Sequence, residues 1–183
     1  KAPYFQPLCY IDIIYNHKLN RDLQILSKVN FRQYWSKILD DLYRVSLAIS
    51  ILELTDKTMS DNDPHPSLFL TLKEVLKAYN NTLIDPKILF WFYECALLNN
   101  LGFQPSLEDP KLPGLVLPNI KNDSSCIVVL STLLSGNMSQ LQEIKVSKKT
   151  SSLISDYLWS LLDYHFEGLS SIKSFKVVKK LLS

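Results

Sequence analysis

The chain opens with two short segments whose hydrophobic side chains are mostly β-branched or aromatic. Residues 7–15 are rich in such side chains, and residues 22–31 alternate hydrophobic and polar positions. Both patterns are typical of β-strands. Residues 16–21, which are polar, have the length of a hairpin connector. Two strands alone are marginally stable in water, so we expect this hairpin to belong to a larger sheet with further strands before Lys1.

Beyond the hairpin, hydrophobic positions recur every three or four residues, a spacing typical of helices. Residues 103–122 differ because they hold four prolines, and we expect an ordered connector there. The predicted helices cover residues 32–55, 68–79, 86–101, 124–135 and 151–169.

The third of these helices carries the clearest end signals. Asp85 can cap its free N–H groups, and Pro86 suits its first turn. Gly102 follows the helix at the position where a left-handed cap is expected. Residues 88–98 are hydrophobic on nearly all sides, so we expect this helix to be central and buried.

Composition favours an ordinary globular protein. Of the 183 residues, 46% are hydrophobic and 21% are charged, which is far from a disordered chain. No hydrophobic run has the roughly 18 residues that a membrane span needs. Cysteines are three in number and far apart, so we expect no disulfide framework and a cytoplasmic protein.

Charge is unevenly distributed along the chain. Residues 1–37 and residues 145–183 each carry a net charge of +4, whereas the middle of the chain carries −6. If the two basic ends meet in space, they form one polyanion-binding face. The alternative is that these lysines only keep the protein soluble.

Motifs for catalysis, nucleotides or metals are absent from the sequence. There is no GxSxG, P-loop or GxGxxG motif, and the three histidines are too dispersed to form a metal site. Cys95 lies in the most hydrophobic helix and is interpreted as a buried, inert thiol, and His165 as a packed histidine. The sequence therefore predicts a protein that is not an enzyme, with no cofactor, no metal and no small-molecule substrate.

Three segments resemble the RecO family of recombination mediators. Residues 6–8, 12–15 and 21–26 are similar to the stretch that closes the family's N-terminal OB-fold. Residues 97–105 (LLNNLGFQP) resemble the end of a helix in the family's helical domain, and residues 164–174 resemble its C-terminus.

The resemblance implies a mainly α fold, in which the last strands of an N-terminal OB-fold β-barrel precede a helical C-terminal domain. We expect residues 1–31 to form the end of the barrel, whose upstream strands are absent, and residues 32–183 to form the helical domain. Many family members hold a zinc ion with four cysteines after the Gly-aromatic-x-Pro signature. Because residues 103–123 contain no cysteine, we expect no zinc there.

The resemblance also implies a function. Such a protein binds single- and double-stranded DNA, anneals complementary strands and works with RecR to load RecA onto DNA coated by single-stranded-DNA-binding protein (SSB). The partners implied are DNA, RecR and the C-terminal tail of SSB, with no membrane, and the place is the cytoplasm, at the nucleoid.

OB-folds bind single strands with basic grooves and stacking aromatic rings, often in the loop between the last two strands. We therefore expect DNA contacts along the hairpin and at the basic C-terminal end, from Lys18, Arg21, Lys28, Arg32, Tyr15, His17, Lys173, Lys176, Lys179 and Lys180. A second hypothesis is a helical protein-interaction module that binds no nucleic acid, since an exposed strand edge can pair with another chain.

Overall fold

The computed structural model describes residues 5–60, 63–81, 83–108, 112–167, 169 and 178. The chain divides into two compact units, residues 1–36 and residues 37–183. The elements in chain order are β1 (Cys9–Asn16), β2 (Ile25–Tyr34), α1 (Ser36–Leu39), α2 (Leu42–Thr58), α3 (Pro66–Asn81), α4 (Pro86–Asn100), the 3-10 helix η2 (Ile120–Asn122), α5 (Ser124–Leu134), the 3-10 helix η3 (Met138–Glu143) and α6 (Lys148–His165).

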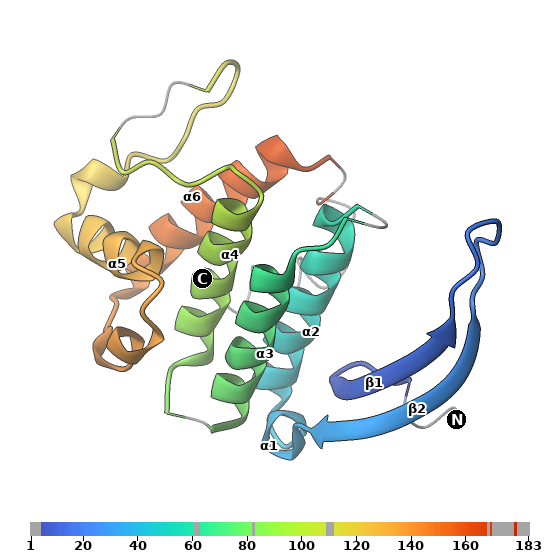
Figure 1. Cartoon of the computed structure of the whole chain (residues 1–183). Coiled ribbons are helices and arrows are strands. Elements are labelled where there is room, and N and C mark those ends of the chain that lie inside the picture. The colour runs from blue at the N-terminus through green and yellow to red at the C-terminus, as the bar shows by residue number, and fades with distance from the viewer. Residues whose placement is uncertain are drawn as a thin grey trace. The chain divides into compact units, whose positions relative to one another are not determined.

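Strands β1 and β2 form the predicted hairpin, with antiparallel pairing. The pairing shifts twice, so that Ser27 and Arg32 on β2 have no direct partner on β1. Such bulges bend a strand and increase its twist, and Figure 1 shows β2 as a strongly curved ribbon. The predicted start of the second strand at residue 22 is wrong, because pairing begins only at Ile25, opposite Asn16.

The hairpin has one hydrophobic face and one mixed face. Directly paired residues lie on the same face of a sheet, and successive pairs alternate. The hydrophobic face holds the pairs Ile11–Phe31, Ile13–Val29 and Tyr15–Leu26, and the mixed face holds Asp12–Asn30 and Ile14–Lys28. Ile13 and Tyr15 are each about half exposed, although they lie on the hydrophobic face.

The single helix predicted over residues 32–55 is wrong in its first part. Residues up to Tyr34 continue β2, because the strand pairs as far as Cys9. After the short α1, Asp41 starts a new helix, α2, by accepting hydrogen bonds from the backbone N–H groups of Tyr43 (2.8 Å) and Arg44 (3.4 Å). A side chain that caps these free N–H groups fixes the start of a helix.

The predictions for the second and third helices are confirmed by α3 and α4. The Asp85 side chain accepts a hydrogen bond from the Lys87 N–H at 2.8 Å, and Pro86 occupies the first turn. At the other end, Gly102 has φ +85°, and the Phe103 N–H donates to the Leu98 carbonyl at 2.8 Å. This is the left-handed cap that the glycine predicted.

Helix α4 is the centre of the helical unit. Eleven of its fifteen residues are buried, from Pro86 to Leu98. It contacts α2 and α3 on one side and α5 and α6 on the other (Figure 1). Within the described ranges, no helix is both long and hydrophobic enough to cross a membrane.

Helix α6 is held against α4 and the connector by partly buried polar contacts. Trp91 of α4 donates to the Ser155 hydroxyl of α6 at 3.1 Å, and Tyr157 donates to the Ser106 carbonyl at 2.7 Å. The short helix predicted over residues 124–135 is confirmed by α5. The last helix was predicted over residues 151–169, but it begins at Lys148, because Ser147 caps the N–H of Thr150, and it ends at His165.

Glu94 is the one acidic side chain buried in the described core, with only 3% of its surface exposed. Its Oε2 atom forms no hydrogen bond with any described residue. Burial raises the pKa of this carboxyl well above its ordinary value of 4.5. The folded protein therefore holds a proton on Glu94 at pH values where the unfolded chain has lost it.

This proton links stability to pH. Below about pH 4.5 Glu94 is protonated in both states, and above it only the unfolded chain ionises, so the free energy of unfolding falls as pH rises. The variant Glu94→Gln cannot ionise. We expect its stability relative to the wild type to increase with pH above about pH 4.5, by at most about 1.4 kcal/mol for each pH unit, measured by urea unfolding.

Glu74→Gln is the matched control, because Glu74 is exposed on α3 and lies 3.6 Å from the Lys77 ammonium group. The free energy of unfolding of Glu74→Gln should change with pH in the same way as that of the wild type. If the stability of Glu94→Gln also ran parallel to the wild type, Glu94 would be ionised in the folded protein.

Candidate nucleic-acid interface

The loop between β1 and β2 is fixed by the side chain of Gln24. Its carbonyl oxygen accepts a hydrogen bond from the Lys18 N–H at 2.8 Å. Its amide nitrogen donates to the carbonyl oxygens of Lys18 at 3.0 Å and Arg21 at 2.6 Å. An amide can do this because it carries both a donor and an acceptor. One side chain thus bridges the loop and closes a turn between Lys18 and Arg21.

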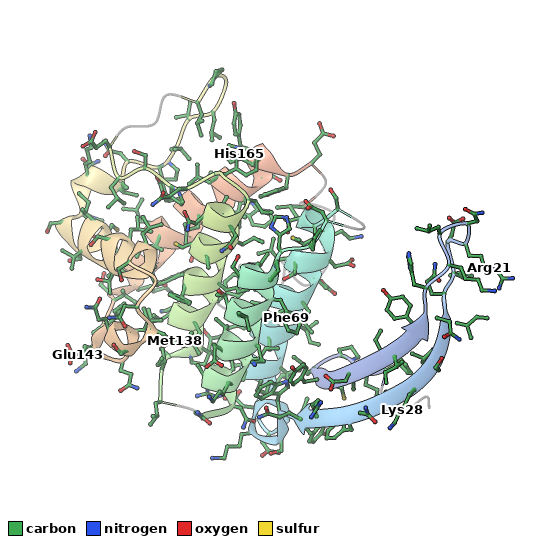
Figure 2. All side chains as sticks on the ribbon, viewed as in Figure 1. Arg21, Lys28, Phe69, Met138, Glu143 and His165 are labelled. Carbon is green, nitrogen blue, oxygen red and sulfur yellow. The ribbon has the colours of Figure 1, made fainter. Side chains whose placement is uncertain are left out.

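The loop brings four of the predicted DNA contacts to the same end of the hairpin. Lys18 and Arg21 lie at the two ends of the turn, and both are exposed (Figure 2 labels Arg21). The rings of Tyr15 and His17 meet edge to face, with centroids 6.3 Å apart. Two exposed cations and two exposed rings thus share this end of the hairpin, and proteins bind the phosphates and bases of single strands with such side chains.

Lys28 and Arg32 are placed differently. Lys28 pairs with Ile14 on the mixed face of the hairpin, whereas Tyr15 lies on the hydrophobic face. Arg32 forms an ion pair with Asp12, which also lies on the mixed face and offsets its charge. Lys18 and Arg21 therefore share the loop end of the hairpin with the aromatic rings, whereas Lys28 lies on the face opposite Tyr15 and Arg32 is paired with Asp12.

The second predicted basic patch cannot be placed. Lys173, Lys176, Lys179 and Lys180 lie outside the described residues. The hairpin loop is therefore the predicted DNA-binding region whose geometry is known.

Other reactive side chains are packed in the helical unit. Cys95 is buried, as predicted, and burial raises the pKa of its thiol. His165 is half-buried and stacks on Phe103, with ring centroids 4.2 Å apart, and burial lowers the pKa of its imidazole. Across the described ranges, no three histidine, cysteine or acidic residues are grouped so that they could hold a metal ion.

Sequence reasoning missed the residues that shape the loop. The alternation of residues 22–31 predicts that Gln24 lies on the polar side of a strand and Leu23 on its hydrophobic side. In the structure Gln24 bridges the loop, while Leu19 and Leu23 are 91% and 87% exposed. A signal for Gln24 was present in the sequence, because an amide side chain directly after a polar connector can bond the loop backbone.

Part of the helical unit matches the model of a known protein family. Residues 39–110 match the family model described as "Recombination protein O C terminal". The matched region begins at the end of α1 and includes α2, α3 and all of α4. The central buried helix is therefore part of the region shared with the family.

Curated relatives named "DNA repair protein RecO" are similar over a longer part of the chain. The protein of Salinibacter ruber is 27% identical over 110 residues, which are 60% of this chain and 42% of the relative. That of Exiguobacterium sibiricum is 30% identical, over 58% of this chain and 43% of the relative. The alignment with the protein of Desulforamulus reducens, at 23% identity, covers 88% of this chain and 71% of the relative.

No solved structure is significantly similar to the chain. The alignments with the first two relatives cover less than half of each relative's length. The family match in the helical region and the agreement of these relatives confirm the resemblance noted in the sequence. The chain is therefore similar to RecO proteins, most clearly in its helical region.

Proposed function

We propose that this protein is a DNA-binding mediator of repair and recombination that catalyses no covalent chemistry. Its relatives carry the name of a DNA repair protein. The observation that carries the proposal is the hairpin loop, where Gln24 bonds the backbone of the exposed residues Lys18 and Arg21, and where the exposed rings of Tyr15 and His17 lie at the same end of the hairpin. The proposed place of action is the cytoplasm, at the nucleoid.

The proposed binding mode is that of an OB-fold loop. Lys18 and Arg21 contact phosphates, and Tyr15 and His17 stack on bases. Lys28 and Arg32 contact DNA from the other face of the hairpin, and the lysines near the C-terminus (Lys173, Lys176, Lys179 and Lys180) add to the charge. These contacts are electrostatic and stacking contacts, so the binding needs no particular base sequence.

The hairpin is proposed to be part of an OB-type β-barrel. Its bulges curve β2, which is how strands close into small barrels. Ile13 and Tyr15 on its hydrophobic face are about half exposed, and further strands would bury such a face. A barrel would also pair the free edges of the two strands.

The proposed activity is to anneal complementary strands and, with RecR, to load RecA onto DNA that carries SSB. The C-terminal tail of SSB is the proposed partner of the helical unit. An acidic tail with hydrophobic end residues needs a hydrophobic pocket rimmed by cations. The second hypothesis, a helical module that binds proteins but no nucleic acid, is separated from this proposal by direct DNA-binding measurements.

The first test reverses the charge of the loop. In the variant Lys18→Glu/Arg21→Glu, two phosphate contacts become repulsive, so we expect affinity for labelled oligothymidylate to fall by about tenfold or more. The slope of log affinity against log salt should also become shallower by about 1.4, because each lost contact to a single strand removes about 0.7. Fluorescence anisotropy over a salt series measures both quantities.

The control is Lys57→Glu/Lys77→Glu, which changes the net charge by the same amount. Each of these lysines lies within 4 Å of a neighbouring carboxylate, on Asp56 and Glu74 respectively. This variant should keep its affinity within about twofold of the wild type. Equal losses in both variants would refute the loop as the contact, and a wild type that binds no DNA at low salt would favour the protein-interaction module.

A second test removes the bridge across the loop. Gln24→Ala leaves the charges in place but removes the hydrogen bonds that order the loop. The loop must then lose conformational entropy when it binds DNA, which weakens the binding. Each lost hydrogen bond contributes about 0.5–1.5 kcal/mol. We expect the Lys18 amide to exchange its hydrogen several-fold faster and the affinity for oligothymidylate to fall by about two- to fivefold.

Gln33→Ala is its matched control, because the Gln33 side chain on β2 forms no hydrogen bond with the described residues. It should alter neither exchange at Lys18 nor DNA affinity. Faster exchange in Gln24→Ala without any change in affinity would show that loop order is unimportant for binding.

A further inference from the structure

The helical unit carries a lysine cluster that the hairpin site does not include. Lys145, Lys148 and Lys149 are all exposed, and they surround Ser147, the capping residue of α6. Among the described residues, none of the three forms an ion pair with a carboxylate, whereas Lys57 and Lys77 each do. Three ammonium groups within five residues, none of them in an ion pair with a described residue, give this surface a local positive charge.

The cluster lies where α5 and α6 both begin. Asp123, the capping residue of α5, accepts a hydrogen bond from the Thr150 hydroxyl at 2.9 Å, which joins the first turns of the two helices. The pKa of Asp123 is lowered mainly by this hydrogen bond and, to a smaller extent, by the nearby Lys149 ammonium group. Lys149 therefore faces the junction between the two helices.

Lys145 also lies near the start of α5. It lines an open pocket of about 590 Å³ together with Ser124 and Ser125 of the first turn of α5. Glu143, at the end of η3, lines this pocket too, and Figure 2 labels it. The positive surface thus extends from Lys145 over Ser147 to Lys149, with Glu143 on one side of it.

The position of these lysines is unfavourable for the helix itself. Backbone dipoles give a helix N-terminus partial positive charge, so cations in the first turn are destabilising there and anions are stabilising. Neither α5 nor α6 has an acidic residue in its first turn. Side chains at a helix start tilt back toward that end, which brings the Lys148 and Lys149 ammonium groups around it. A local cost of this kind is expected at functional sites.

We propose that Lys145, Lys148 and Lys149 form a second DNA-contact surface, which binds the sugar–phosphate backbone of single-stranded DNA. Phosphate charges neutralise the three lysines and also complement the start of α6, whose capping residue Ser147 is uncharged. The surface rests on the proposed function, because it takes DNA as the polyanion.

The test is the variant Lys148→Glu/Lys149→Glu. Glutamates in the first turn complement the helix dipole, so the melting temperature should stay the same or rise. Affinity for labelled oligothymidylate should nevertheless fall by about tenfold, and the salt slope should become shallower by about 1.4. The conservative variant Lys148→Arg/Lys149→Arg should bind like the wild type. A variant that was partly unfolded would have a lower melting temperature, so weaker binding at an unchanged or higher melting temperature indicates a lost DNA contact.

Lys57→Glu/Lys77→Glu again controls for net charge and should bind within about twofold of the wild type. If the wild type binds with a steep salt slope and Lys148→Glu/Lys149→Glu matches this control, the second surface is refuted while the proposed function stands. If the wild type binds no oligothymidylate at low salt, the proposed function and the second surface both fail.

Discussion

The helical unit depends on the burial of α4 from all sides. A helix that is hydrophobic all round must be surrounded, and here α2, α3, α5 and α6 do this. Each neighbour then needs only one hydrophobic stripe of its own. Local signals determine where α4 begins and ends, namely the Asp85 cap and the Gly102 turn. These signals do not depend on distant parts of the chain.

The same packing positions the charged surface of the unit. Because α5 and α6 both lie against α4 and are joined through Thr150 and Asp123, their first turns are held together. Lys148 and Lys149 thus begin a helix whose first turn is joined to the start of α5. In the hairpin, Gln24 has the corresponding role, since it holds the loop that carries Lys18 and Arg21. Both candidate DNA contacts are flexible cations on an ordered backbone, which lowers the entropy cost of binding.

Much of this fold was predictable because its signals are local. The capped helix α4 and its central position follow from Asp85, Gly102 and the hydrophobic residues between them. Pairing between strands is not local, so the extension of β2 to Tyr34 and the bulge at Ser27, which places Lys28 on the face opposite Tyr15, were not visible in the sequence. The ion pair of Arg32 with Asp12 depends on the same register. The start of α6 was placed three residues too late because Ser147 was not recognised as a cap, and so the lysines around it were not singled out.

The central claim is that the chain binds DNA through charged surfaces held by ordered backbone. Hydrogen exchange of the whole chain, with and without oligothymidylate, tests it most directly because it reports every amide at once. Binding should slow exchange in the hairpin loop, residues 17–24, and around the start of α6, residues 145–150, and should leave the amides of α3 unchanged. An exchange pattern that oligothymidylate does not alter in either region would contradict the account.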